Sequence, residues 1–197
     1  MNPFIRVATG LFILTLGAFL LPNAFASAPA THMAYLSVTS GSEFRFIECV
    51  TDACDQPNDI LLSTDAIAAY AIVNGADQKG FIAYLGNHGA KKGLFSLKCT
   101  NGNCSQHTIE GLVAMTATIG ELSVAMRGNG TPFITYFNAN DHLLHAYACD
   151  DAACKSGKDR VLDTVVNNGV KSVVKISPDG NPAILYWGAV TPLHFLV

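Results

Sequence analysis

The sequence predicts an all-β fold, a β-propeller-like array of four-stranded antiparallel blades that closes into a small ring or forms an open arc. Two observations support this prediction: features that recur every 50 residues or so, and short apolar segments separated by turns rich in glycine and asparagine. Four antiparallel strands repeated in units of about 50 residues are typical of propeller blades. The chain holds about three and a half such repeats.

The period is clearest in three kinds of residue. Six cysteines form three C-x4-C pairs whose first members are 50 residues apart: Cys49 and Cys54, Cys99 and Cys104, Cys149 and Cys154. Four tyrosines follow nearly the same step within similar pentapeptides: Tyr35, Tyr84, Tyr136 and Tyr186. Turns with an Asx residue precede the last three tyrosines, at Asp77, Asn129 and Asp179.

Each unit is expected to contain four strands. The first strand runs into the Asx turn, and the tyrosine strand returns from it as a hairpin. The first strands are predicted at 67–73, 122–127 and 172–177. The third strands of the first three units end at the first cysteine and are predicted at 44–49, 94–99 and 144–149, and that of the last unit is predicted at 193–197. The more polar fourth strands are predicted at 60–64, 107–110 and 161–165.

The order of these segments places the repeat units at about 33–66, 67–117, 118–166 and 167–197. The chain therefore enters at a second strand and stops at a third, with about 14 strands in all. Two blades are complete and two each lack one edge strand. An uncovered apolar edge invites pairing with another chain, so self-association through these terminal half-blades is expected if the ring does not close.

Residues 1–26 are predicted to be a signal peptide. Arg6 precedes an uncharged apolar stretch at 7–21, and Ala24-Phe25-Ala26 offers the small residues that a signal peptidase requires. The alternative is a retained membrane anchor, but the stretch is shorter than the roughly 20 residues that cross a bilayer. We expect a secreted or periplasmic protein with a single domain at 27–197 and no membrane span after signal removal.

Composition excludes two classes. The chain is 50% hydrophobic and 14% charged, which does not fit a disordered protein. Its net charge is −3, and no basic cluster occurs beyond Lys91 and Lys92, so a nucleic-acid partner is not expected.

The repeats resemble those of exported bacterial proteins described as sialidase-like or BNR-like β-propellers, whose function is mostly unassigned. The resemblance covers roughly 33–197 and is strongest at 144–154 and 177–187, which match Leu-x-x-Ala-x-Cys and Asp-Gly-x-Pro-x-Ile-x-Tyr patterns. A true Asp-box reads Ser-x-Asp-x-Gly-x-Thr-Trp, whereas this chain has Ser177-Pro-Asp-Gly-Asn-Pro. The resemblance implies a fold rather than an activity.

The recurring residues have structural interpretations, each with an alternative. The cysteines are expected to form three local disulfides in an oxidising compartment, with metal ligation as the alternative. The tyrosines are expected to pack between blades, with a ligand-stacking ring as the alternative. The Asx residues suit turns, with calcium binding as the alternative. His145 and His194 occupy equivalent third-strand positions on a face expected to be partly exposed, and a metal pair there is disfavoured. No cofactor is expected.

Motifs for catalysis are largely absent. The chain has no G-x-S-x-G, H-E-x-x-H or P-loop pattern. A sialidase brings three arginines together, but Arg45, Arg127 and Arg160 are predicted on a third, a first and a fourth strand. The sequence therefore favours a scaffold that binds a glycan, peptide or surface partner. A degenerate glycoside hydrolase and a structural or oligomerising repeat protein are the alternatives.

Overall fold

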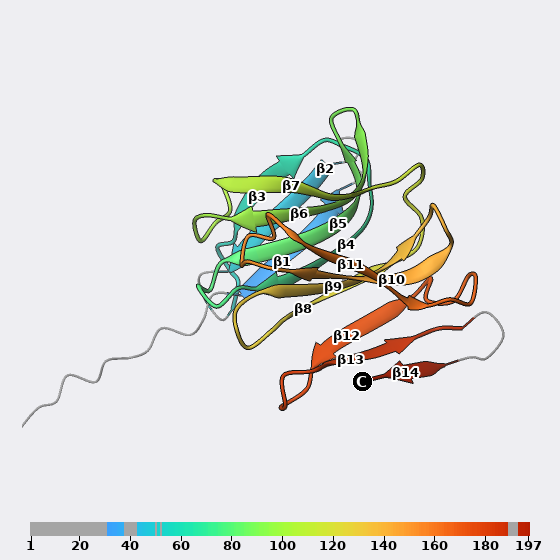
Figure 1. The fold of residues 1–197 in the computed structure, drawn as a ribbon. Helices are drawn as coiled ribbons and strands as arrows, with labels where there is room; N and C mark the ends of the chain where they lie inside the picture. Colours follow the sequence, from blue (N-terminus) through green and yellow to red (C-terminus); the bar gives the residue numbers. More distant parts are fainter. Residues whose placement is uncertain (1–30, 38–42, 50, 52, 189–192) are drawn as a thin grey trace, which may run out of the picture.

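The computed structural model of the protein describes residues 31–37, 43–49, 51, 53–188 and 193–197. The predicted signal peptide at 1–26 lies outside the described residues. Within them the regular elements are all β-strands, 14 in number, which form four antiparallel sheets (Figure 1). This confirms the predicted fold class. No helix among these residues has the length and hydrophobicity to cross a membrane.

The four sheets follow one another along the chain, and we call them blades 1 to 4. Blade 1 contains β1 (Thr31–Ser37), β2 (Glu43–Cys49) and β3 (Asn58–Ser63). Blade 2 contains β4 (Ile67–Asn74), β5 (Gly80–His88), β6 (Lys91–Cys99) and β7 (His107–Ala114). Blade 3 contains β8 (Leu122–Met126), β9 (Pro132–Asn138), β10 (Leu143–Cys149) and β11 (Gly157–Asp163). Blade 4 contains β12 (Ser172–Ile176), β13 (Pro182–Tyr186) and β14 (His194–Leu196).

The strand register repeats from blade to blade. Each recurring tyrosine is paired across its hairpin with the same third-strand position: Tyr35 with Arg45, Tyr84 with Phe95, Tyr136 with His145, and Tyr186 with His194. In the first three blades the pairing of third and fourth strands shifts at this position. Such a bulge bends the outer strand and increases its twist. The 50-residue period is therefore a period of backbone geometry as well as of sequence.

The blades are arranged as an open arc. Packing between blades joins β1 to β4, β4 to β8, and β8 to β12. Figure 1 shows the sheet of β12, β13 and β14 at one end of this row. Among the described residues, no comparable packing joins blade 4 back to blade 1.

Three apolar clusters fill the three junctions of this arc. Because side chains alternate along a strand, each blade presents one set of residues to the blade before it and another to the blade after it. Ile82 and Tyr84 face blade 1, where they meet Phe44 and Phe46, while Phe81 faces blade 3. A third cluster joins blades 3 and 4. Each fully buried large apolar side chain contributes roughly 1.5–3 kcal/mol.

The fourth strand of blade 3 differs from its prediction. The sequence placed it at 161–165, but β11 spans Gly157–Asp163. The charged residues at 158–160 lie on this outer edge strand and are exposed. Charge on an edge strand is also a common defence against pairing with other chains. Alternation of apolar residues is therefore a poor guide to the outermost strand of a blade.

Candidate functional site

The three C-x4-C pairs lie at disulfide distance in the loops between third and fourth strands, with Cα atoms 4.7 to 4.9 Å apart. In each loop the backbone amide of the second cysteine donates to a carbonyl three residues earlier, at Thr51, Asn101 and Asp151. The second cysteine has a positive φ each time. Such a bridge fixes a tight turn, and the three pairs are consistent with an extracellular or otherwise oxidising compartment.

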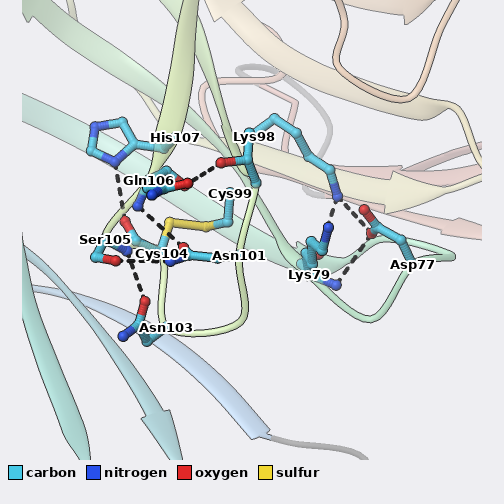
Figure 2. The surroundings of a disulfide bond; sticks show 11 residues. Asp77, Lys79, Lys98, Cys99, Asn101, Asn103, Cys104, Ser105, Gln106 and His107 are labelled. Atoms are coloured by element: carbon cyan, nitrogen blue, oxygen red, sulfur yellow. Dashed lines mark hydrogen bonds and ion pairs between the residues drawn. A yellow bond between two sulfur atoms is a disulfide. The ribbon is translucent and has the colours of Figure 1, made fainter.

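The loop of blade 2 is held by a dense set of polar contacts around its disulfide (Figure 2). The amide of Asn101 donates to Ser105 at 2.8 Å, and Asn103 accepts from the backbone of Ser105 at 3.1 Å. Beside the loop, the Nζ of Lys98 lies 2.7 Å from a carboxylate oxygen of Asp77 (Figure 2). These contacts lie within blade 2 and hold the loop in place, which suits a structural role for it.

The Asx residues lie in the turns that join first and second strands. Asp77 accepts a hydrogen bond from the backbone of Lys79, and Asn129 accepts one from the backbone of Thr131. Asp179 occupies the equivalent position in blade 4. Burial opposes ionisation of Asp77, but the ammonium of Lys98 and the amide of Lys79 together lower the pKa of its carboxyl group. No group of three or more metal-ligating side chains gathers among the described residues.

The tyrosines of blades 2, 3 and 4 are buried between blades, whereas Tyr35 of blade 1 is partly exposed. The ring of Tyr84 stacks on Phe95. The hydroxyl group of Tyr136 donates to Asp159 at 2.8 Å, and that of Tyr186 donates to Asp163 at the same distance. The structure therefore distributes the four tyrosines along the arc and does not gather them around one cavity.

A polar cluster surrounds Tyr136 in blade 3. His145 is buried, with Nδ1 3.1 Å from Asp159 and Nε2 2.9 Å from Asp141. Burial, followed by the charge of Asp159, raises the pKa of Tyr136 well above its ordinary range. His145 therefore does not lie on the partly exposed face expected from the sequence. Its polar atoms have partners inside the blade, which suits a structural role.

The same positions in blade 1 carry a related cluster at the surface. Tyr35 donates to Asp59 at 2.9 Å, and Arg45 binds both Asp59 and Glu43 at 3.0 Å. Of the other arginines, Arg127 contacts the carbonyl oxygen of Cys149, and Arg160 lies exposed on β11. The three arginines thus belong to blades 1 and 3, and two of them have partners within their own blade.

A groove of about 500 Å³ opens on blade 2, and we call it the Phe95 groove. Its lining includes Lys91, Lys92, Phe95, Gly111, Val113 and Met115. Gly111 pairs with Phe95 across the strands, and Leu61 and Val161 occupy its position in blades 1 and 3. A side chain at 111 would begin 3.5 Å from the Phe95 ring, which is itself only 3% exposed, so glycine leaves the groove open beside a buried ring.

Aromatic and basic groups border the Phe95 groove. Phe95 lies between the stacked ring of Tyr84 and the edge of His88, and His88 lies 3.6 Å from Asp65. Lys91 and Lys92 are exposed at the start of β6. A concave apolar floor with a few charged groups at its rim is the usual form of a small-ligand site. The sequence identified Lys91 and Lys92 as its only basic cluster, but a groove was not expected there.

A second hollow, of about 250 Å³, lies on blade 4 beside Trp187. Trp187 is the only tryptophan of the chain and is 56% exposed. Its neighbours include Leu185, Leu193 and the ion pair of Lys171 with Glu121. Leu85 and Phe137 hold the same position in blades 2 and 3 and are buried, whereas no blade in the described part of the chain packs on the face that bears this hollow.

Comparison with known proteins shows likeness in fold only. No protein-family profile matches the chain, and no curated protein matches it in sequence. Among solved structures, the crystal structure of the intramolecular trans-sialidase from Ruminococcus gnavus in complex with oseltamivir carboxylate aligns with a TM-score of 0.56 and 16% identity. The alignment covers 80% of this chain and 36% of the trans-sialidase chain.

This chain thus spans about a third of the length of the solved structure that it resembles. At 16% identity the alignment establishes a shared sheet architecture and transfers no residue role. It supports the sialidase-like resemblance at the level of fold, and no family match supports the narrower assignment to BNR repeats.

Proposed function

We propose that the protein is a glycan-binding module and that the Phe95 groove holds an acidic sugar. The groove carries this proposal because it combines an apolar lining, the space left by Gly111 and two exposed lysines. The apolar face of a sugar ring packs against apolar side chains such as Leu112 and Val113, and lysine ammonium groups attract carboxylate or sulfate groups. The Cys99–Cys104 pair fixes the loop that follows β6 and so supports a rigid frame for such a site.

The similar solved structure guides the choice of sugar. It is a trans-sialidase in complex with oseltamivir carboxylate, a ligand that bears a carboxylate group. Acidic sugars are therefore the first class to test, with neutral sugars and acidic peptides as comparison ligands. Because the lysines are exposed, their attraction for an anion is expected to weaken as salt screens it.

The test is a glycan array followed by titration calorimetry with the acidic sugars that bind. Gly111→Val fills the groove as Val161 does in blade 3, and Lys91→Ala with Lys92→Ala removes the charged rim. Each change is expected to weaken binding at least tenfold, which is about 1.4 kcal/mol. Lys155→Ala with Lys158→Ala is the matched control, because these lysines are also exposed and lie on another blade.

Two results would contradict the proposal. One is an array on which no acidic sugar binds, and the other is a bound sugar whose affinity is unchanged by filling the groove. The same sugars are also incubated with the protein and examined for cleavage. Release of new reducing ends that the groove variants abolish would favour the alternative of a glycoside hydrolase.

A further inference from the structure

The outer face of blade 4 is largely apolar, and none of the described residues covers it. Leu193 and Phe195 are 59% and 63% exposed. The residues at the same two positions of the other blades are at most 3% exposed: Phe44, Leu94, Leu144, Phe46, Ser96 and Ala146. In blades 1, 2 and 3 this face packs against the next blade through the apolar cluster at their junction. Blade 4 therefore presents one half of a blade junction to solvent.

The outer face of blade 1 is the other half. Met33 is 44% exposed, whereas its equivalents Ile82, Ile134 and Ile184 are almost fully buried against the preceding blade. Tyr35 likewise is partly exposed where Tyr84 is buried. At all three junctions of the arc, a face of the kind found on blade 4 packs against a tyrosine-bearing face of the kind found on blade 1.

We propose that the blade 4 face of one molecule binds the blade 1 face of a second copy of this chain, head to tail. The occupant follows from the repeat itself, because the three junctions within the chain show which surface covers such a face. The central contact is then formed by Leu185 and Phe195 of one copy against Met33 and Tyr35 of the other.

The polar groups on blade 1 are compatible with being covered. Blade 3 carries a tyrosine bonded to an aspartate beside a basic ring, and in this group Tyr136 and His145 are buried at a junction while Asp159 stays at its solvent edge. In blade 1 the guanidinium group of Arg45 already binds Asp59 and Glu43. Each of these three charged groups therefore keeps a hydrogen-bonded partner when the face is covered, which lowers the penalty for burying ions.

A head-to-tail contact uses two different surfaces, so it closes into a ring or grows into longer assemblies. This property separates it from pairing of two β14 edges, which uses one surface twice and stops at a dimer. It also gives a specific test with two variants. Leu185→Arg places a charge on the blade 4 face, and Met33→Glu places one on the blade 1 face.

The measurement is sedimentation velocity of the purified protein over a range of micromolar concentrations. The wild type is expected to form dimers or larger species as its concentration rises. Each variant alone is expected to stay a monomer because one of its two faces is spoiled. An equimolar mixture of the two variants is expected to form a dimer and nothing larger, because only one intact pair of faces remains.

Val161→Glu is the control, since Val161 is also an exposed apolar residue but lies on the outer strand of blade 3. It is expected to associate like the wild type. Urea unfolding of each variant confirms that it is folded. A wild type that remains a monomer throughout would overturn the proposal and assign the faces to another partner. So would association that Met33→Glu leaves intact, which would indicate pairing of blade 4 with itself.

Discussion

The junction between blades 2 and 3 and the outer face of blade 4 are built from equivalent strand positions, and they differ in what covers them. At the junction, Leu85 and Leu94 lie fully buried in an apolar cluster with Tyr136. On blade 4, Trp187 and Leu193 hold the corresponding places and face solvent. The positions of these apolar residues therefore follow the sequence repeat and do not depend on whether the position is exposed. The two faces therefore share their apolar character and differ in whether another blade of the described arc covers them.

The largest effect is expected from truncating a junction tyrosine, and its terminal counterpart provides the comparison. Tyr136→Ala removes a fully buried aromatic ring and is expected to cost about 3–5 kcal/mol. Tyr35→Ala is expected to cost about 0.5 kcal/mol when the protein is dilute, as is usual for surface changes. Urea unfolding at low concentration measures both. Equal losses of stability would mean that the two faces do not differ in burial.

The disulfides of blades 1 and 2 are expected to differ in the same way as the blade faces, the terminal one being more accessible. Cys104 is fully buried in blade 2, whereas Cys54 is partly exposed in blade 1. A mild reductant is therefore expected to open Cys49–Cys54 before Cys99–Cys104, as measured by thiol labelling and mass spectrometry.

Replacing Cys99 and Cys104 by alanine is expected to lower the free energy of unfolding by about 2 kcal/mol, the contribution of closing a short loop. Labelling of the unreduced, unfolded protein is expected to find no free thiol, and two or more free thiols would contradict the assigned pairs.

A smaller, pH-dependent effect is expected where blade 3 meets blade 4. Burial opposes ionisation of Asp163, but Asn168, a backbone amide and the Tyr186 hydroxyl together lower the pKa of its carboxyl group. A lowered pKa in the folded state stabilises the protein above the unfolded value of about 4, and this stability is lost as pH falls through the folded value. Burial and Asp163 also raise the pKa of Tyr186 to about 12.

Tyr186→Phe is therefore expected to cost about 1 kcal/mol at neutral pH. It is also expected to flatten the fall in stability below pH 4, since one of the groups that lowers the pKa of Asp163 is gone. Urea unfolding at several pH values measures both effects. Tyr35→Phe is the terminal comparison, because the hydroxyl of Tyr35 also donates to an aspartate but lies near solvent. A pH profile of Tyr186→Phe that is parallel to the wild type would refute the coupling.

The smallest effect concerns a turn. Gln78 has φ of 58°, while Gly130 and Gly180 occupy the same place in the turns of blades 3 and 4. A side chain in this left-handed region costs about 1–2 kcal/mol, and glycine avoids that cost but loses more entropy on folding. Gln78→Gly is therefore expected to stabilise the protein by about 0.5 kcal/mol or a little more. A loss of stability measured by urea unfolding would show that Gln78 makes contacts that outweigh its strain.

The repeat allowed much of the fold to be predicted, because cysteines, tyrosines and Asx turns mark the same place in every blade. The repeat predicted the inner strands well and the bounds of β11 less well, because the charged residues of β11 face solvent and do not pack in a core. The Phe95 groove was not predicted because it depends on the absence of a side chain. Comparing Gly111 with Leu61 and Val161 in aligned repeats is the signal that points to it.

The uncovered blade faces were harder still to predict. Met33 and Ile82 are both apolar residues on a tyrosine strand, and only the packing of blades distinguishes a buried position from an exposed one. The burial of His145 has the same cause. A variable third-strand position suggested exposure, but blade 3 has a neighbour at that face and two aspartates to satisfy the ring.

Quenching of tryptophan fluorescence tests the open arc most directly, because Trp187 is the only tryptophan and lies on the outer face of blade 4. In dilute solution, acrylamide is expected to quench its emission efficiently, and the emission is expected to be red-shifted as for an indole in water. As protein concentration rises, quenching is expected to decrease and the emission to shift to the blue. Poorly quenched, blue-shifted emission at the lowest concentration would contradict an uncovered face on blade 4.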